Sequence, residues 1–170
     1  GNLINVKSPY IYQLDESKMN FKINLYGVGI EKDINSKLVY KGKFPPNELP
    51  DKIDGDLGLI WDGNFDESDE NIKFKNYTKY NNPHKASLYL AAGFPVIMWK
   101  QAALASFIVE NNLGFVVDNL EELPQKLSQI SEQDYNEMVI NVQKMGKKIR
   151  SGYFLSEALK KADKVLEENK

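Results

Sequence analysis

The stretch KASLYLAAGFPVIMW, residues 85–99, decides the fold class. Its first half places apolar residues three to four positions apart, which predicts a helix over Lys85–Ala92, and Gly93 is a typical helix stop. Its second half, Phe94–Trp99, is a short apolar run that predicts a strand buried on both faces. A helix followed by such a strand is the repeating unit of an α/β protein with a parallel sheet.

The rest of the chain continues this alternation of strands and helices. Strands are predicted where short apolar or alternating segments occur, at residues 21–27, 37–41, 57–61 and 113–117. Helices are predicted between and after them, at residues 8–15, 102–111, 119–130, 131–146 and 156–168. We therefore expect one α/β domain over residues 1–170 with a mainly parallel sheet.

Local signals predict where three of these helices begin and end. Asn119 with Glu122 three residues later has the pattern of a capping box, although Pro124 lies close to that start. Ser131 is expected to begin the next helix, and Gly146 is expected to end it. The last helix is expected over about residues 156–168.

Composition excludes several functional classes. The chain has 22 Lys and Arg against 24 Asp and Glu, a formal net charge of −2, which argues against a nucleic-acid-binding protein. It has no cysteine and one histidine, so disulfides, cysteine nucleophiles and multi-histidine metal centres are excluded. No apolar run approaches the ~20 residues of a membrane span and no signal peptide is visible, so a cytoplasmic location is expected.

The start of the predicted helix at Lys85 is a candidate anion site. The first N–H groups of a helix have no partner within it and carry positive potential. Asn82 is a candidate cap, Pro83 suits the first turn, and Lys85 adds a full positive charge. His84 is weak evidence for an acid or base. The alternative is that Asn82 only caps the helix and Lys85 is solvated.

Three further groups have both a functional and a structural interpretation. Lys7 precedes a second helix start at Ser8–Pro9, where it is either a second cation for an anion or an ordinary surface lysine. The loop 42–44, Gly42-Lys43-Phe44, either stacks its aromatic ring on a planar base or covers the end of the sheet. Trp61-Asp62 at a strand end either binds sugar hydroxyls or assists catalysis, or simply forms an Asp-Gly turn.

Residues 81–97 resemble the donor-binding helix and following strand of GT-B glycosyltransferases. The resemblance is to the bacterial branch of galactofuranosyltransferases and related glucosyltransferases of surface-glycan assembly, and it extends over nearly all of the chain. It implies a Rossmann-like three-layer sandwich, the C-terminal half of a GT-B fold. Gly1-Asn2-Leu3 resembles the end of the first strand, which implies that the strand itself and the N-terminal acceptor domain are missing.

The resemblance also implies roles for particular residues. By position, Lys7 and Lys85 match the cations that hold the donor diphosphate, beside the helix-start residues Asn82, Pro83 and His84. The nucleoside side is matched by Gly42, Lys43, Phe44, Ser87 and Leu88, and Trp61 and Asp62 are sugar-side candidates. The chain departs from the family at Leu88, where many retaining members carry a glutamate that contacts the ribose.

The implied function is binding of a nucleotide-sugar, most simply a UDP-sugar, for transfer of a hexosyl group to a surface-glycan or glycoprotein acceptor. The donor is a substrate, so neither a cofactor nor a metal is expected, and the catalytic residue is not identified. The fragment alone is expected to be inactive, and the missing domain would bring it to the inner face of the membrane. The sequence leaves open whether the protein forms a homo-oligomer. The alternative is a non-catalytic Rossmann-like interaction module that has lost donor binding.

Overall fold

The computed structural model describes residues 1–31, 34–62 and 78–168, and within them it has five strands. The strands are β1 (Ile23–Tyr26), β2 (Leu38–Gly42), β3 (Gly58–Ile60), β4 (Val96–Trp99) and β5 (Gly114–Val117). Every strand pair is parallel, which confirms the predicted α/β class. The strands form two sheets, β1–β2 and β3–β4–β5.

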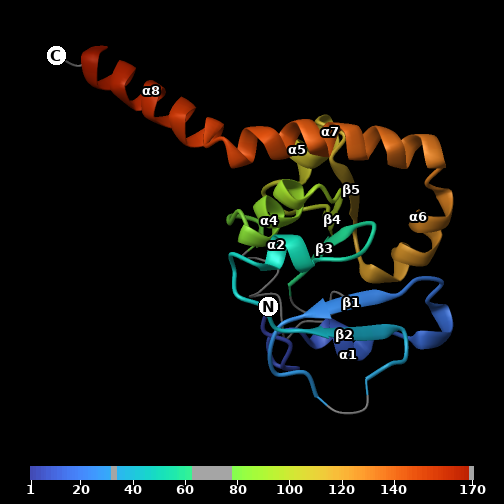
Figure 1. Cartoon of the computed structure of the whole chain (residues 1–170). Coiled ribbons are helices and arrows are strands. Elements are labelled where there is room, and N and C mark those ends of the chain that lie inside the picture. The colour runs from blue at the N-terminus through green and yellow to red at the C-terminus, as the bar shows by residue number, and fades with distance from the viewer. Residues whose placement is uncertain (32–33, 63–77, 169–170) are drawn as a thin grey trace.

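Helices precede or follow these strands along the chain (Figure 1). The α-helices are α1 (Pro9–Gln13), α2 (Leu49–Lys52), α4 (His84–Ala92), α5 (Ala105–Glu110), α6 (Leu123–Gln129), α7 (Glu132–Arg150) and α8 (Tyr153–Glu168). Two short 3₁₀ helices lie at Glu16–Lys18 and Leu120–Glu122.

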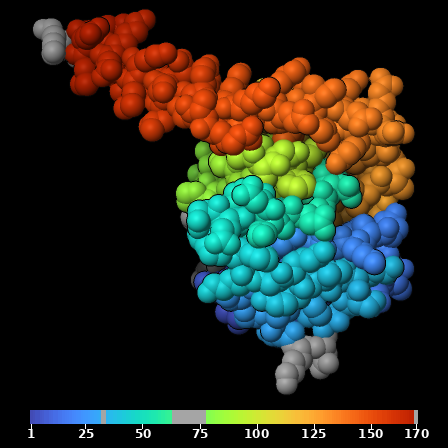
Figure 2. All heavy atoms as spheres, viewed as in Figure 1, coloured from blue at the N-terminus to red at the C-terminus, as the bar shows by residue number. Residues whose placement is uncertain are grey.

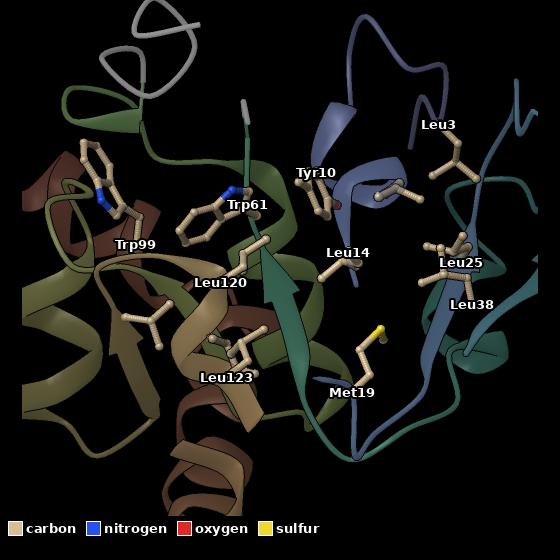
Figure 3. Packing of buried hydrophobic residues seen from close by; sticks show 13 residues of the cluster. Leu3, Tyr10, Leu14, Met19, Leu25, Leu38, Trp61, Trp99, Leu120 and Leu123 are labelled. Carbon is tan, nitrogen blue, oxygen red and sulfur yellow. The ribbon is translucent and has the colours of Figure 1, made fainter. Parts of the chain in front are cut away.

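The core has two parts because β4 is buried on both faces. Ile97 and Trp99 belong to one cluster, which also contains the buried side chains of α1 and β1 (Figure 3). Val96 and Met98 belong to the other cluster, with buried residues of α4, α5 and α7. The β3–β4–β5 sheet is therefore the middle layer, as the continuous apolar run of β4 predicts.

Residues 1–3 lie beside the carboxyl end of β1. Asn2 forms an isolated parallel bridge with Val28, and the Leu3 amide donates to the Val28 carbonyl at 2.8 Å. The segment thus occupies the position of a short neighbouring strand end, in agreement with the resemblance of Gly1-Asn2-Leu3 to such an end.

Two predicted helix starts are wrong in detail. Helix α4 begins at His84, and Pro83 rather than Asn82 is its N-cap, without a side-chain cap bond. Asn119 forms no capping bond either, because the chain first makes the 3₁₀ turn Leu120–Glu122. Helix α6 then begins at Leu123, which places Pro124 in its first turn, where proline is tolerated.

The predicted end of α7 is also wrong. The Ser131–Asp134 capping box is present as the sequence indicates, but the helix continues through Gly146 to Arg150. A Cβ at Gly146 would lie 2.7 Å from the Leu90 carbonyl oxygen of α4. This glycine is therefore a close-contact residue that allows α7 to lie against the backbone of α4. Gly93 does end α4, in the left-handed region with a φ of 95°.

Helix α8 projects from the rest of the structure (Figures 1 and 2). It begins at Tyr153, three residues earlier than predicted, and none of its residues is buried. Its exposed apolar side chains are Tyr153, Phe154, Leu155, Leu159, Val165 and Leu166. Within the part of the chain that the structure describes, no helix is both long and apolar enough to cross a bilayer.

Candidate nucleotide-sugar site

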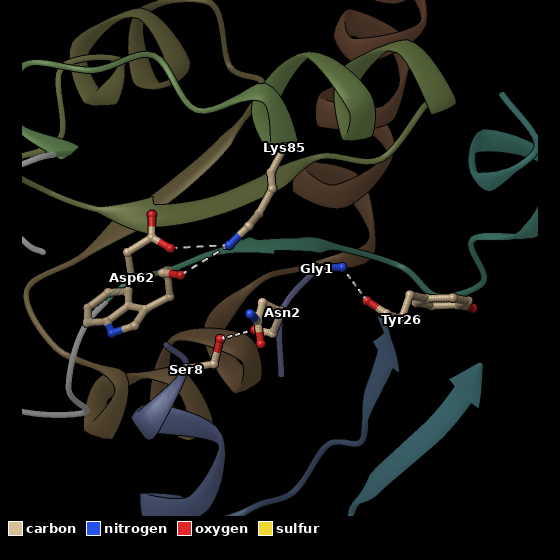
Figure 4. Close-up of polar contacts among 7 residues, drawn as sticks. Gly1, Asn2, Ser8, Tyr26, Asp62 and Lys85 are labelled. Atoms are coloured by element: carbon tan, nitrogen blue, oxygen red, sulfur yellow. Dashed lines mark hydrogen bonds and ion pairs between the residues drawn. The ribbon is translucent and has the colours of Figure 1, made fainter. Parts of the chain in front are cut away.

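The ammonium group of Lys85 lies at the end of β3 (Figure 4). Its Nζ atom is 3.3 Å from Asp62 Oδ1 and donates to the Trp61 carbonyl at 3.4 Å. The side chain of Lys85 is 39% exposed and that of Asp62 is 32% exposed. The lysine is thus held at a strand end while its charge remains accessible from solvent.

Helix α4 gives this position a positive potential. Lys85 is the second residue of the helix, directly after His84, and the first amides of a helix have no acceptor within it. The Pro83 carbonyl accepts from the Ala86 amide at 2.9 Å, which fixes the first turn. The side chains of Asn82 and His84 are exposed. Helix start and ammonium together favour an anion at this point.

A small pocket lies next to the Lys85–Asp62 pair. Its volume is about 10 Å³, close to the space of one water molecule. It is lined by Ile60, Trp61, Asp62, Thr78, Pro83, Met98, Trp99 and Ala102. Lys79 Nζ lies 5.3 Å from the centre of the Trp99 ring, within the range of a cation–π contact. The two tryptophans therefore form an apolar wall beside the charged pair.

Gly1 and the loop 42–44 both lie at the carboxyl end of β1. The Tyr26 carbonyl accepts from the Gly1 nitrogen at 2.7 Å (Figure 4). Burial, and then the positive charge of Lys85, lower the pKa of the Gly1 amino group. The Tyr26 ring is 6.3 Å from that of Phe44, centre to centre. The loop 42–44 therefore lies beside the end of β1, where the Gly27 amide also donates to the Gly42 carbonyl at 3.0 Å.

The start of α1 lies on the same edge. Ser8 Oγ donates to the Asn2 carbonyl at 2.8 Å (Figure 4), and Ser8 is the N-cap of α1. Lys7 directly precedes Ser8 and is exposed. The backbone of Lys7 therefore lies at this edge of the sheet. The binding of a donor diphosphate by its side chain stays a prediction.

Tyr10 of α1 is a residue of this region that sequence reasoning missed. Burial, followed by the charges of Tyr89 and Asp62, raises the pKa of Tyr10 far above its usual range. Its hydroxyl therefore remains protonated. No sequence signal distinguishes Tyr10 from an ordinary core residue, because its burial depends on how α1 packs into the core cluster.

The nucleoside candidates on α4 lie farther along the helix. Ser87 is exposed and Leu88 is half-buried, and α2 packs against the same helix. Among the described residues, no three His, Asp or Glu side chains converge as metal ligands would.

Comparison with known proteins shows the family of this chain. The sequence profile of the family described as "Glucosyltransferase 3-like, C-terminal domain" matches residues 1–162. The chain belongs to this family. The resemblance to a C-terminal glycosyltransferase domain, inferred above from residues 81–97, is thereby confirmed.

Individual relatives of this Glucosyltransferase 3-like domain are glycosyltransferases. Beta-1,6-galactofuranosyltransferase WbbI of Escherichia coli (strain K12) is 36% identical over 162 residues, 94% of this chain and 46% of the relative. Glucosyltransferase 3 of Streptococcus gordonii is 37% identical over 122 residues, 72% of this chain and 35% of the relative. The chain spans less than half the length of the curated relatives it matches.

Proposed function

We propose that this domain is the donor-binding half of a GT-B glycosyltransferase and holds a UDP-sugar by its diphosphate. One observation carries the proposal: the Lys85 ammonium lies at the start of α4 and at the carboxyl end of β3, within 3.3 Å of a carboxylate oxygen. Ligands of parallel α/β sheets bind beyond the carboxyl ends of the strands. A lysine at a helix start in that place is suited to a diphosphate.

The arrangement also suits the chemistry of sugar transfer. The diphosphate gains negative charge as the bond between sugar and phosphate breaks. Lys85 and the first amides of α4 would stabilise that charge without having to reorganise. Lys7 would supply a second cation from the start of α1.

The remaining candidates are assigned around this diphosphate position. Phe44 would stack on the base, since its loop, Gly42-Lys43-Phe44, follows β2 next to Tyr26. Ser87 and Leu88 would face the ribose, and Trp61 and Asp62 would face the sugar. The transferred group would be a hexosyl group, because the relatives are named as galactofuranosyl- and glucosyltransferases.

The acceptor site and the catalytic base are assigned to a second domain. The relatives are more than twice as long as the part this chain matches. Helix α8 would pack its exposed apolar residues against that domain. The acceptor would be a surface glycan or glycoprotein, met in the cytoplasm or at the inner face of the membrane. The 170-residue chain alone is expected to bind donor and transfer no sugar.

Calorimetric titration of the chain with UDP tests this function. Lys85→Ala should weaken binding by about 1.5–3 kcal/mol, as expected for the loss of one charge-assisted contact. Lys100→Ala is the matched control, because Lys100 also pairs with an aspartate at a strand end, and it should leave the affinity unchanged.

Two outcomes would contradict the proposal. Equal UDP affinity in wild type and Lys85→Ala would remove Lys85 from the site. A folded chain that binds neither UDP nor a UDP-sugar would favour the non-catalytic interaction module.

A further inference from the structure

The carboxylate of Asp62 stands where an anion would meet Lys85. Its Oδ1 atom is 3.3 Å from Lys85 Nζ, and Figure 4 shows the carboxylate and the ammonium facing each other across the end of β3. A donor phosphate that reaches Lys85 must therefore lie beside this carboxylate or replace it. Asp62 therefore affects the binding free energy of any anion that reaches Lys85.

Asp62 is not free to withdraw far from this position. The preceding residue, Trp61, is only 2% exposed and is held in the core. The Trp61 carbonyl accepts from the same ammonium at 3.4 Å. The Asp62 backbone is thus fixed at its N-terminal side, and the carboxylate stays within reach of a ligand bound at Lys85.

A carboxylate discriminates between neighbours by charge and by hydrogen-bonding type. It only accepts hydrogen bonds, so a sugar hydroxyl is a suitable partner and a deprotonated phosphate oxygen is not. The terminal phosphate of UDP carries an additional negative charge above about pH 6, as phosphate monoesters do. In a UDP-sugar that oxygen is esterified, the extra charge is absent, and hydroxyl groups take its place.

We propose that Asp62 makes the site discriminate between the nucleotide-sugar and the nucleoside diphosphate left after transfer, by accepting from the sugar and repelling the free terminal phosphate. This inference rests on the proposed function. It assigns Asp62 a specificity role that favours release of the product, and it does not require Asp62 to take part in bond breaking.

The test compares four ligands by calorimetry at pH 7.5: UDP, the methyl ester of its terminal phosphate, UDP-glucose and UDP-galactofuranose. Asp62→Asn should raise the affinity for UDP about fivefold, which is the upper end of what a partly exposed charge pair contributes. The affinity for the methyl ester should change less, because the ester lacks the extra charge. The affinity for either UDP-hexose should stay equal or fall. Asp118→Asn, the partner of Lys100, is the control and should change none of them.

The outcomes separate this inference from the function on which it rests. If Asp62→Asn changes UDP and UDP-hexose affinity by the same factor, the discrimination by Asp62 is wrong while donor binding stands. If wild-type chain binds none of the ligands, the proposed function fails and the inference with it. Should Asp62→Asn not fold, as judged by thermal unfolding, Asp62→Ser is measured instead, with the same selective tightening of UDP expected.

Discussion

The Lys85–Asp62 pair and the Lys100–Asp118 pair both lie at the ends of strands of the three-stranded sheet, and they differ in what surrounds them. Lys85 and Asp62 are 3.3 Å apart, with side chains 39% and 32% exposed. Lys100 and Asp118 are 3.1 Å apart, with side chains 62% and 49% exposed. The distances alone do not distinguish the pairs, whereas the burial and the elements that supply the residues do.

The Lys100–Asp118 pair joins the residues that directly follow β4 and β5. The Lys100 amide already donates to the Val117 carbonyl at 2.9 Å, so the side chains add an exposed ion pair to an existing strand contact. Such pairs contribute little. Lys85 instead comes from the first turn of α4 and reaches across to β3, so it adds its charge to the unpaired amides of a helix start. The comparison shows that the helix start, more than the ion pair, marks the candidate site.

The largest expected effect comes from the support of α4. Gly146→Ala would place a Cβ 2.7 Å from the Leu90 carbonyl oxygen, which forces α4 and α7 apart. We expect a loss of about 1–3 kcal/mol in the free energy of unfolding, as for other overpacked contacts, and weaker UDP binding because Lys85 moves with α4. Denaturant unfolding and calorimetry measure the two effects.

The control for this change is Lys147→Ala at the next, exposed position of α7, which should leave both quantities nearly unaltered. Unchanged stability in Gly146→Ala would mean that the close approach of α7 does not hold α4 in place.

A smaller effect is expected from the loop after β2. Phe44→Ala should weaken UDP binding by roughly 1–2 kcal/mol if the ring stacks on the base. Tyr153→Ala also removes one aromatic ring, at the exposed start of α8, and should not affect binding. An unaltered affinity in Phe44→Ala would support the structural interpretation, in which the ring only covers the sheet end beside Tyr26.

The smallest effect concerns the stability of the two pairs themselves. Double-mutant cycles with Ala at the lysine and Asn at the aspartate should give coupling energies below about 1 kcal/mol for both pairs. The value for Lys85–Asp62 should be the larger, because these side chains are less exposed. A larger coupling energy for Lys100–Asp118 would show that lower exposure does not strengthen the Lys85–Asp62 pair.

The strands and the main helix of the site could be predicted because their signals are local. The apolar run of β4 and the left-handed stop at Gly93 both appear where the sequence places them. Gly146 was misread because a glycine that ends a helix and a glycine that admits a neighbouring backbone look alike in one sequence. Only the packing of α7 on α4 separates these two cases.

The Lys85–Asp62 contact depends on long-range structure. The residues are 23 positions apart, and each has an ordinary local meaning, a helix-start lysine and a strand-end aspartate. Their meeting requires α4 to pack on β3. The same holds for the burial of Tyr10, which joins the core cluster of Trp61 from α1. The helix-start pattern and the family resemblance both identified Lys85 as a candidate, but neither gave any indication of its partner.

The most direct test of the central claim is an ¹H–¹⁵N NMR titration of the 170-residue chain with UDP. We predict that the largest amide shifts occur at His84, Lys85 and Ala86 in the first turn of α4, with smaller shifts in the loop 42–44. The amides of Lys100 and Asp118 should stay unperturbed. The largest shifts at Lys100 and Asp118, with an unperturbed start of α4, would contradict a diphosphate site at that helix start.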